Sequence, residues 1–141
     1  MRRSPTITLT ILAVLLAASL AWAGPMAPDD MRLAPPAGWP STKPCVEFSH
    51  ASHSDAKIDC TICHHTWDGK GPIQSCSAAG CHDQQGKTGP QALYAAFHAK
   101  DAQSSCLGCH KTANARDGAN LPVGCKDCHA RKGDGGRRGK K

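Results

Sequence analysis

The sequence predicts a small, mostly irregular and helical domain with a short N-terminal β element, organised around bound groups more than around an apolar core. Two observations support this fold class. Beyond residue 23, 11 of 118 residues are Leu, Ile, Val or Phe, below the roughly 20% at which a chain normally gathers a core of its own. In addition, a pattern of cysteine and histidine repeats four times along the chain.

Three of the repeats have two cysteines separated by two residues, with a histidine directly after the second cysteine. The fourth repeat has the same order with four residues between the cysteines. This pattern is typical of c-type haem attachment, in which both sulfurs bond to the porphyrin and the histidine binds iron from one face. We therefore expect four covalently attached haem c groups, at Cys60, Cys63 and His64; Cys76, Cys81 and His82; Cys106, Cys109 and His110; and Cys125, Cys128 and His129.

Four histidines remain outside the repeats, one for each expected iron. Successive residues of a helix point about 100° apart, so His64 and His65 cannot reach the same iron. A histidine on both faces would leave no iron position open to a substrate, which favours an electron carrier that is not an enzyme. The candidate second ligands are His50, His53, His65 and His98.

Three alternatives to this interpretation can be tested. A disulfide framework would fit nine cysteines in an exported chain, but a histidine would follow all four pairs by chance about once in 10⁵ cases. A zinc-stapled interaction module could use the same residue types, and it would be colourless. A small multihaem reductase of metal ions or oxyanions would need one iron with an open position.

Residues 1–23 have the features of an export signal. Arg2 and Arg3 form a basic start, the stretch 7–20 is mostly apolar, and the small residues around Trp22 predict cleavage near Ala23/Gly24. A membrane anchor is the alternative, but about 14 apolar-rich residues are fewer than the roughly 20 that span a bilayer. We expect an exported protein whose mature chain has no membrane span.

The mature chain begins with a proline-rich segment, residues 24–44, which we expect to form an extended arm. Alternation at Val46–Phe48 predicts a short strand. Ser49 can then cap a helical turn that places His50 and His53 on one face. The haem domain would cover residues 45–130.

One helix is expected to start near Pro90 and to continue through His98, with Tyr94 and His98 four residues apart on a face that would meet a haem. Residues 114–124 are expected to form a loop. Residues 131–141 form a basic, glycine-rich tail. Cys45 is left over from the four motifs, as a free thiol or as an intermolecular link.

The net charge is +6, or +4 after loss of Arg2 and Arg3. Each haem adds two propionates, so the sequence gives no reason to expect nucleic acid binding. Basic groups near the third and fourth motifs could instead steer docking to an acidic partner. They are Lys111, Lys126, Arg131 and Lys132.

From Val46 to His129, the order of motifs and spare histidines resembles the tetrahaem class III cytochromes c, which are periplasmic electron carriers of sulfate-reducing bacteria. The resemblance implies that His50 ligates the first haem, His65 the second, His53 the third and His98 the fourth, each opposite the histidine of the motif. It also implies redox partners, a hydrogenase or a membrane-bound redox complex. The last motif departs from many members, because two residues and not four separate its cysteines.

Overall fold

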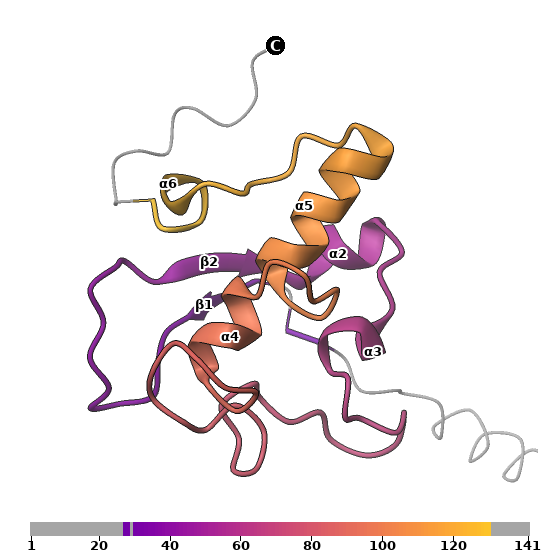
Figure 1. Cartoon of the computed structure of the whole chain (residues 1–141). Helices are drawn as coiled ribbons and strands as arrows, with labels where there is room; N and C mark the ends of the chain where they lie inside the picture. Colours follow the sequence, from indigo (N-terminus) through magenta and orange to yellow (C-terminus); the bar gives the residue numbers. More distant parts are fainter. Residues whose placement is uncertain (1–26, 29, 131–141) are drawn as a thin grey trace, which may run out of the picture.

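The structure is a computed structural model, and it describes residues 27–28 and 30–130. Two strands precede five short helices: β1 (Asp30–Leu33), β2 (Val46–Ser49), α2 (His50–Asp55), α3 (Cys60–Cys63), α4 (Leu93–His98), α5 (Cys106–Asp117) and α6 (Cys125–Cys128), with turns and loops between them (Figure 1). The predicted fold class is therefore confirmed. The export signal in residues 1–23 and the tail in residues 131–141 lie outside the described residues, and the division of the chain at residues 44/45 stays a prediction.

The β element is an antiparallel pair that joins the proline-rich segment to the rest of the domain. The strand expected at Val46–Phe48 is confirmed and extends to Ser49. Its partner β1 pairs Asp30 with Ser49 and Leu33 with Val46. Strand β1 contains no proline, so it keeps the amide donors that a ladder needs. Part of the segment that was expected to be an extended arm therefore belongs to the sheet.

Helix α2 follows β2 without a loop, because Ser49 ends the strand and caps the helix. The Ser49 hydroxyl accepts a hydrogen bond from the Ser52 amide at 3.2 Å, as expected for an N-cap serine. The predicted helical turn that carries His50 and His53 is thereby confirmed.

Helix α4 begins at Leu93, so its predicted start near Pro90 was wrong. The amide of Gln84 donates to the Gln91 carbonyl and the amide of Leu93 donates to the Gln84 carbonyl, each at 3.1 Å. This bridge pairs Gln84 with Ala92 and holds Ala92 in an extended conformation, so the helix begins only at Leu93.

Helix α5 is the longest described helix, and its last four residues, 114–117, were wrongly expected to belong to a loop. Asn114 explains the difference, since its side-chain amide donates to the Leu121 carbonyl at 3.0 Å and its side-chain oxygen accepts from the Leu121 amide at 2.8 Å. The helix therefore continues until Gly118, whose φ of 65° ends it in the left-handed conformation.

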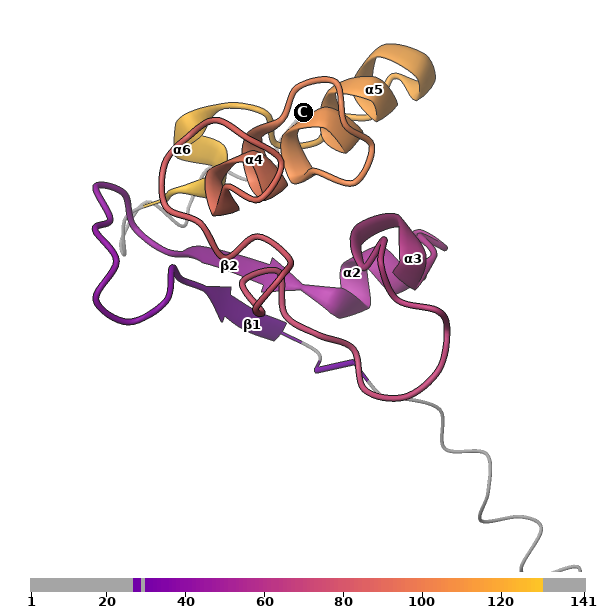
Figure 2. The same ribbon diagram turned by 60° about the horizontal axis from the view of Figure 1, so that its bottom comes forward.

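Figure 2 shows α4, α5 and α6 on one side of the molecule, with the β1–β2 pair and α2 on the other. Among the described residues, the buried side chains are few: Ala92, Leu93 and Ser105. Larger apolar side chains such as Ile62, Tyr94 and Val123 are exposed. The polypeptide alone thus offers little core. In the described part of the chain, no helix has the length and apolar character to cross a membrane.

Candidate functional site

The cysteine motifs share a backbone turn that brings the histidine back to the first cysteine. In the first motif, the His64 amide donates to the Cys60 carbonyl at 2.9 Å. The last motif repeats this bond between His129 and Cys125 at the same distance. Each turn places two sulfurs and one imidazole on a single short segment, as attachment of one porphyrin requires.

The second motif reaches the same arrangement with a longer spacer. The His82 amide donates to the Cys76 carbonyl, again at 2.9 Å, across six residues instead of four. Gly80 makes this possible, since its φ of 84° turns the chain and its amide donates to the Asp83 carboxylate at 2.8 Å. The two extra residues therefore form a turn inside the motif and leave its ends in place.

The thiols of the motifs are unpaired, and burial raises the pKa of several of them. All nine cysteines are free. Burial raises the pKa of Cys76 and Cys128, and it raises the pKa of Cys106 to about 11. Zinc binds thiolates, and within residues 27–28 and 30–130 no three Cys, His, Asp or Glu side chains gather as a metal cluster would require.

Two pairs of histidine rings face each other in nearly parallel planes. The centroids of His53 and His110 lie 6.2 Å apart at 16°, and those of His98 and His129 lie 6.1 Å apart at 10°. Two imidazoles on opposite sides of one metal ion should be separated by about 6 Å, from two bonds of about 2 Å and about 1 Å from each nitrogen to its ring centre. Both pairs therefore fit one iron between their rings.

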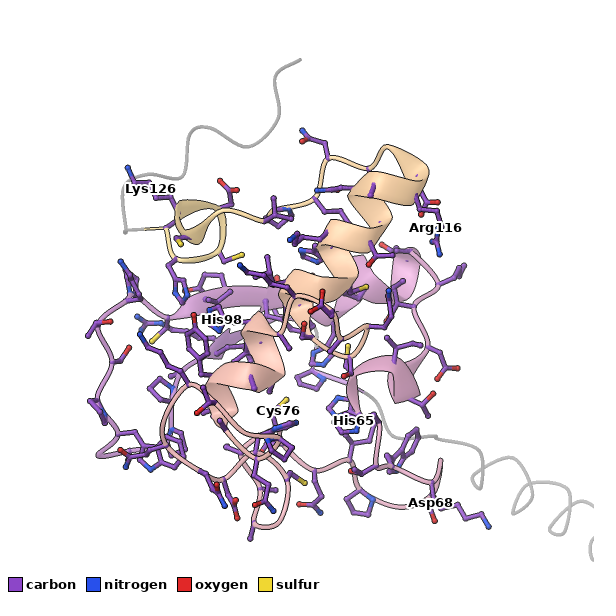
Figure 3. The ribbon with its side chains drawn as sticks, viewed as in Figure 1. His65, Asp68, Cys76, His98, Arg116 and Lys126 are labelled. Carbon is purple, nitrogen blue, oxygen red and sulfur yellow. The ribbon has the colours of Figure 1, made fainter. Side chains whose placement is uncertain are left out.

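Of the other four histidines, two also form a pair, with less regular geometry. The ring centroids of His65 and His82 lie 5.7 Å apart, with their planes tilted by 59°. Burial lowers the pKa of His64, a backbone hydrogen bond with Gln74 raises it, and the charges of both His50 and His65 lower it. Figure 3 shows His65 beside α3 and His98 beside α4.

Backbone carbonyls hold the parallel rings by the nitrogen that faces away from the partner. His53 Nδ1 contacts the carbonyl of Ser49, the N-cap of its helix, at 2.8 Å, and His98 Nδ1 contacts the Tyr94 carbonyl within α4 at 2.9 Å. A hydrogen bond of this kind fixes the proton on Nδ1 and leaves the lone pair of Nε2 free to bind a metal.

The motif histidines of these two pairs use carbonyls from distant loops. His110 Nδ1 contacts the Pro122 carbonyl at 2.9 Å, and His129 Nδ1 contacts the Pro44 carbonyl at 2.7 Å, 85 residues earlier in the chain. The Pro44 bond ties the last motif to the segment just before β2. Cys45, which belongs to no motif, is half-buried next to this acceptor.

Two of the remaining histidine rings have no hydrogen bond at Nδ1 to any described residue. The Nδ1 atoms of His50 and His82 are buried and have no hydrogen-bond partner in the described structure. A buried donor without a partner is costly, so it calls for an explanation. Rings that are held through Nε2 by a metal would have a reason to stay in this position.

Among the predicted histidines the structure thus forms three ring pairs, His65/His82, His53/His110 and His98/His129, and the charge of His50 acts on His64. A cysteine pair precedes each motif histidine in the sequence. The residues fit four bis-histidine haems. Sequence reasoning missed the carbonyls of Pro44 and Pro122, because nothing in the residue pattern marks a backbone acceptor. Of the basic residues considered for docking, Lys111 and Lys126 are exposed, and Lys126 points away from α6 in Figure 3. Arg131 and Lys132 lie outside the described residues.

Comparison with known proteins gives a consistent result. The sequence model of the class III cytochrome c family matches residues 26–129. The chain is 48% identical over 109 residues to cytochrome c3 of Maridesulfovibrio salexigens, covering 75% of this chain and 97% of the relative. It is 45% identical over 104 residues to cytochrome c3 of Desulfovibrio desulfuricans, covering 73% and 95%.

Among solved structures, the crystal structure of the di-tetraheme cytochrome c3 from Desulfovibrio gigas is similar, with a TM-score of 0.65 and 34% identity. The match covers 74% of this chain and 98% of that one. It therefore includes nearly the whole of the known fold.

Proposed function

Because this chain belongs to the class III cytochrome c family, we propose that it is a periplasmic electron carrier that receives electrons from a hydrogenase or a similar donor and delivers them to a membrane-bound redox complex. The family carries four covalently bound c-type haems, and the four motifs of this chain provide one attachment point for each. Each haem supplies a reversible one-electron change at its iron when bound.

Each haem in this proposal is held by two cysteines and two histidines. The cofactor-binding cysteines are Cys60, Cys63, Cys76, Cys81, Cys106, Cys109, Cys125 and Cys128. The iron ligands are the pairs His50/His64 for the first haem, His65/His82 for the second, His53/His110 for the third and His98/His129 for the fourth. The ring separations of 6.1 and 6.2 Å in the two parallel pairs carry the proposal, since they match the space that one iron needs.

In this proposal the side chains hold each haem in place and exclude a substrate from its iron. With imidazole on both faces, no position of the iron is open to a substrate, so transfer of electrons is favoured over chemistry on a bound molecule. The carbonyls that accept from Nδ1 keep the rings in one tautomer through oxidation and reduction. Because all four sites lie within about 80 residues, whose radius of gyration is only about 12 Å, electrons can pass between them inside the protein.

Docking is proposed at the face that carries the last motif. Lys126 lies inside that motif between Cys125 and Cys128, and it is exposed. A positive group so close to a haem would attract an acidic partner surface, with association slowing as salt rises. Lys111 and the basic tail that follows residue 130 would add to this attraction. Export would follow from cleavage near Ala23/Gly24.

Carbon monoxide binding separates this function from the alternative of a reductase with one open iron. We expect the reduced wild-type protein to show no change in its visible spectrum under carbon monoxide. His53→Gly provides the positive control, because it removes one ligand from the third iron and should bind one equivalent. Stoichiometric binding by the wild-type protein would contradict the carrier and support the reductase.

A further inference from the structure

Tyr94 is the single tyrosine of the chain, and it lies one helical turn before His98 on α4. Their rings stack with centroids 4.0 Å apart and planes within 10° of parallel. His98 in turn faces His129 at 6.1 Å, also within 10°. Three aromatic rings therefore follow one another in nearly the same orientation.

Residue 94 contacts His98 in two independent ways. Its carbonyl accepts from His98 Nδ1 at 2.9 Å, which fixes where that nitrogen points. Its side chain covers the face of the imidazole. The hydrogen bond alone would still allow the imidazole to tilt about the line between donor and acceptor, and the stacked phenol opposes that tilt.

The outer ring of this stack, that of Tyr94, is exposed and lies near the charged side chain of Lys87. The Tyr94 residue is 42% exposed, so surrounding core does not hold it in place. The ammonium of Lys87 lies 5.7 Å from the centre of its ring, where the negative face of an aromatic attracts a positive charge. The phenol is thus held between an ammonium and an imidazole.

Another aromatic side chain, Phe48, contacts ligand histidines in a different manner. Its ring lies 4.7 Å from that of His53 with a tilt of 30°, and it meets His50 edge to face at 4.8 Å. Phe48 therefore separates two imidazoles and does not align with either. Parallel alignment on a ligand ring distinguishes Tyr94.

From this geometry we infer that Tyr94 is a positioning residue, which sets the ring plane of His98 and through it the ligand field at the fourth iron, with Lys87 supporting the outer face. The inference rests on the proposed ligation of that iron by His98 and His129. It has a physical consequence, because the angle between two axial imidazole planes governs the splitting of the iron d orbitals. That splitting is measured as the anisotropy of the electron paramagnetic resonance signal of low-spin ferric haem.

The first test compares two variants of the full-length holoprotein in the oxidised state. Tyr94→Leu removes the ring, and Tyr94→Phe keeps the ring but not the hydroxyl. Haem content is measured first by the pyridine haemochrome. We expect Tyr94→Leu to shift the g values of one of the four low-spin signals, Tyr94→Phe to match the wild type, and Lys87→Gln to give a smaller shift. A Tyr94→Leu spectrum identical to that of the wild type, with four haems present, would overturn the inference.

The second test needs no substitution, so it holds even if Tyr94→Leu incorporates fewer haems. Tyrosine labelled with ¹³C in its ring reports on position 94 alone, since no other tyrosine exists. We expect ring signals displaced from those of a free tyrosine and moved again on reduction. Signals at free-tyrosine positions in both redox states would contradict the stack. Fewer than four bis-histidine signals in the wild-type protein would instead contradict the proposed function.

Discussion

The third and fourth ligand pairs differ from the first and second in how the polypeptide prepares them. In the pairs His53/His110 and His98/His129, the rings are parallel and every Nδ1 has a backbone acceptor. In the pair His65/His82 the rings are tilted by 59°, and the Nδ1 atoms of His50 and His82 are buried without partners. The chain therefore orients the later sites itself, whereas the earlier sites depend more on the haem.

The difference follows from the local structure around each pair. Helices α4 and α5 are joined through the buried residue Ser105, whose hydroxyl donates to the carbonyls of Ala99 and Ala102 and accepts from the Gly108 amide. His65 and His82 instead come from the region between α3 and α4, which is mostly turns and loops. Preformed geometry needs packed helices, and this region has none.

The largest expected effect comes from comparing two variants, one that lacks the third haem and one that lacks the second. In the proposed ligation the third haem would join α2 to α5 through His53 and His110, whereas the second would be held within residues 65–82. A porphyrin that buries a few hundred Å² contributes on the order of 5 kcal/mol at about 25 cal/mol per Å². We expect Cys106→Ala with Cys109→Ala to prevent recovery of a folded protein, and Cys76→Ala with Cys81→Ala to yield a folded three-haem protein. Mass spectrometry and thermal unfolding measure both, and equal melting temperatures would remove the proposed difference.

Gly108 tests the contact between α4 and α5 without touching a haem ligand. A Cβ there would collide with the Ala102 carbonyl and lie 2.8 Å from the Ala99 carbonyl. We expect Gly108→Ala to lower the free energy of unfolding by about 1–3 kcal/mol, the usual cost of overpacking. Gly124→Ala is the matched control, because its Cβ would meet the mobile carboxylate of Asp127 and not backbone. Chemical denaturation of the two holoproteins gives the comparison, and a Gly108 variant as stable as the control would contradict this packing.

The N-cap serines of α5 and α2 allow the later and the earlier ligand pairs to be compared by the same substitution, serine to alanine. Ser105 caps α5 and is 2% exposed, whereas Ser49 caps α2 in a more open place. Substitution of an N-cap by alanine costs about 0.5–2 kcal/mol. We expect Ser105→Ala near the upper end of this range, because the Ala99 carbonyl also loses its donor, and Ser49→Ala near the lower end. Chemical denaturation measures both variants. A larger loss of unfolding free energy for Ser49→Ala than for Ser105→Ala would contradict this order.

The smallest expected effect concerns acid stability at Asp59, the exposed cap of α3. Hydrogen bonds from the Thr61 hydroxyl and amide lower the pKa of this carboxyl below 3.8. A lowered folded pKa means that the stabilisation is present above the unfolded value and is lost as pH falls through the folded one. We expect Asp59→Ala to be slightly less stable than the wild type at pH 6, and we expect this difference to shrink as pH falls below the usual pKa of the carboxyl. A difference that grows on acidification would have the wrong sign.

The sequence was informative where chemistry depends on residue identity. Spacing of cysteines and histidines indicated four attachment sites, and three of the spare histidines, His53, His65 and His98, lie 6.2, 5.7 and 6.1 Å from a motif histidine, measured between ring centroids. Fold class was predictable because so few apolar residues could not form a core. The spacing of four residues between Tyr94 and His98 predicted that both side chains lie on one face of a helix.

What could not be predicted depends on backbone and on distant contacts. Strand β1 was hidden in a proline-rich segment, since its role is defined by pairing with β2. The length of α5 depends on Asn114 reaching Leu121, and the start of α4 depends on a bridge from Gln84. The carbonyl of Pro44 acts on His129 across 85 residues, so only a folded chain brings them together.

A crystal structure of the oxidised holoprotein tests the central claim most directly, because it locates each iron between its ligands. We predict four irons, each about 2 Å from two Nε2 atoms, in the pairs His50/His64, His65/His82, His53/His110 and His98/His129. An iron bound by water, methionine or a histidine from another pair would contradict the account.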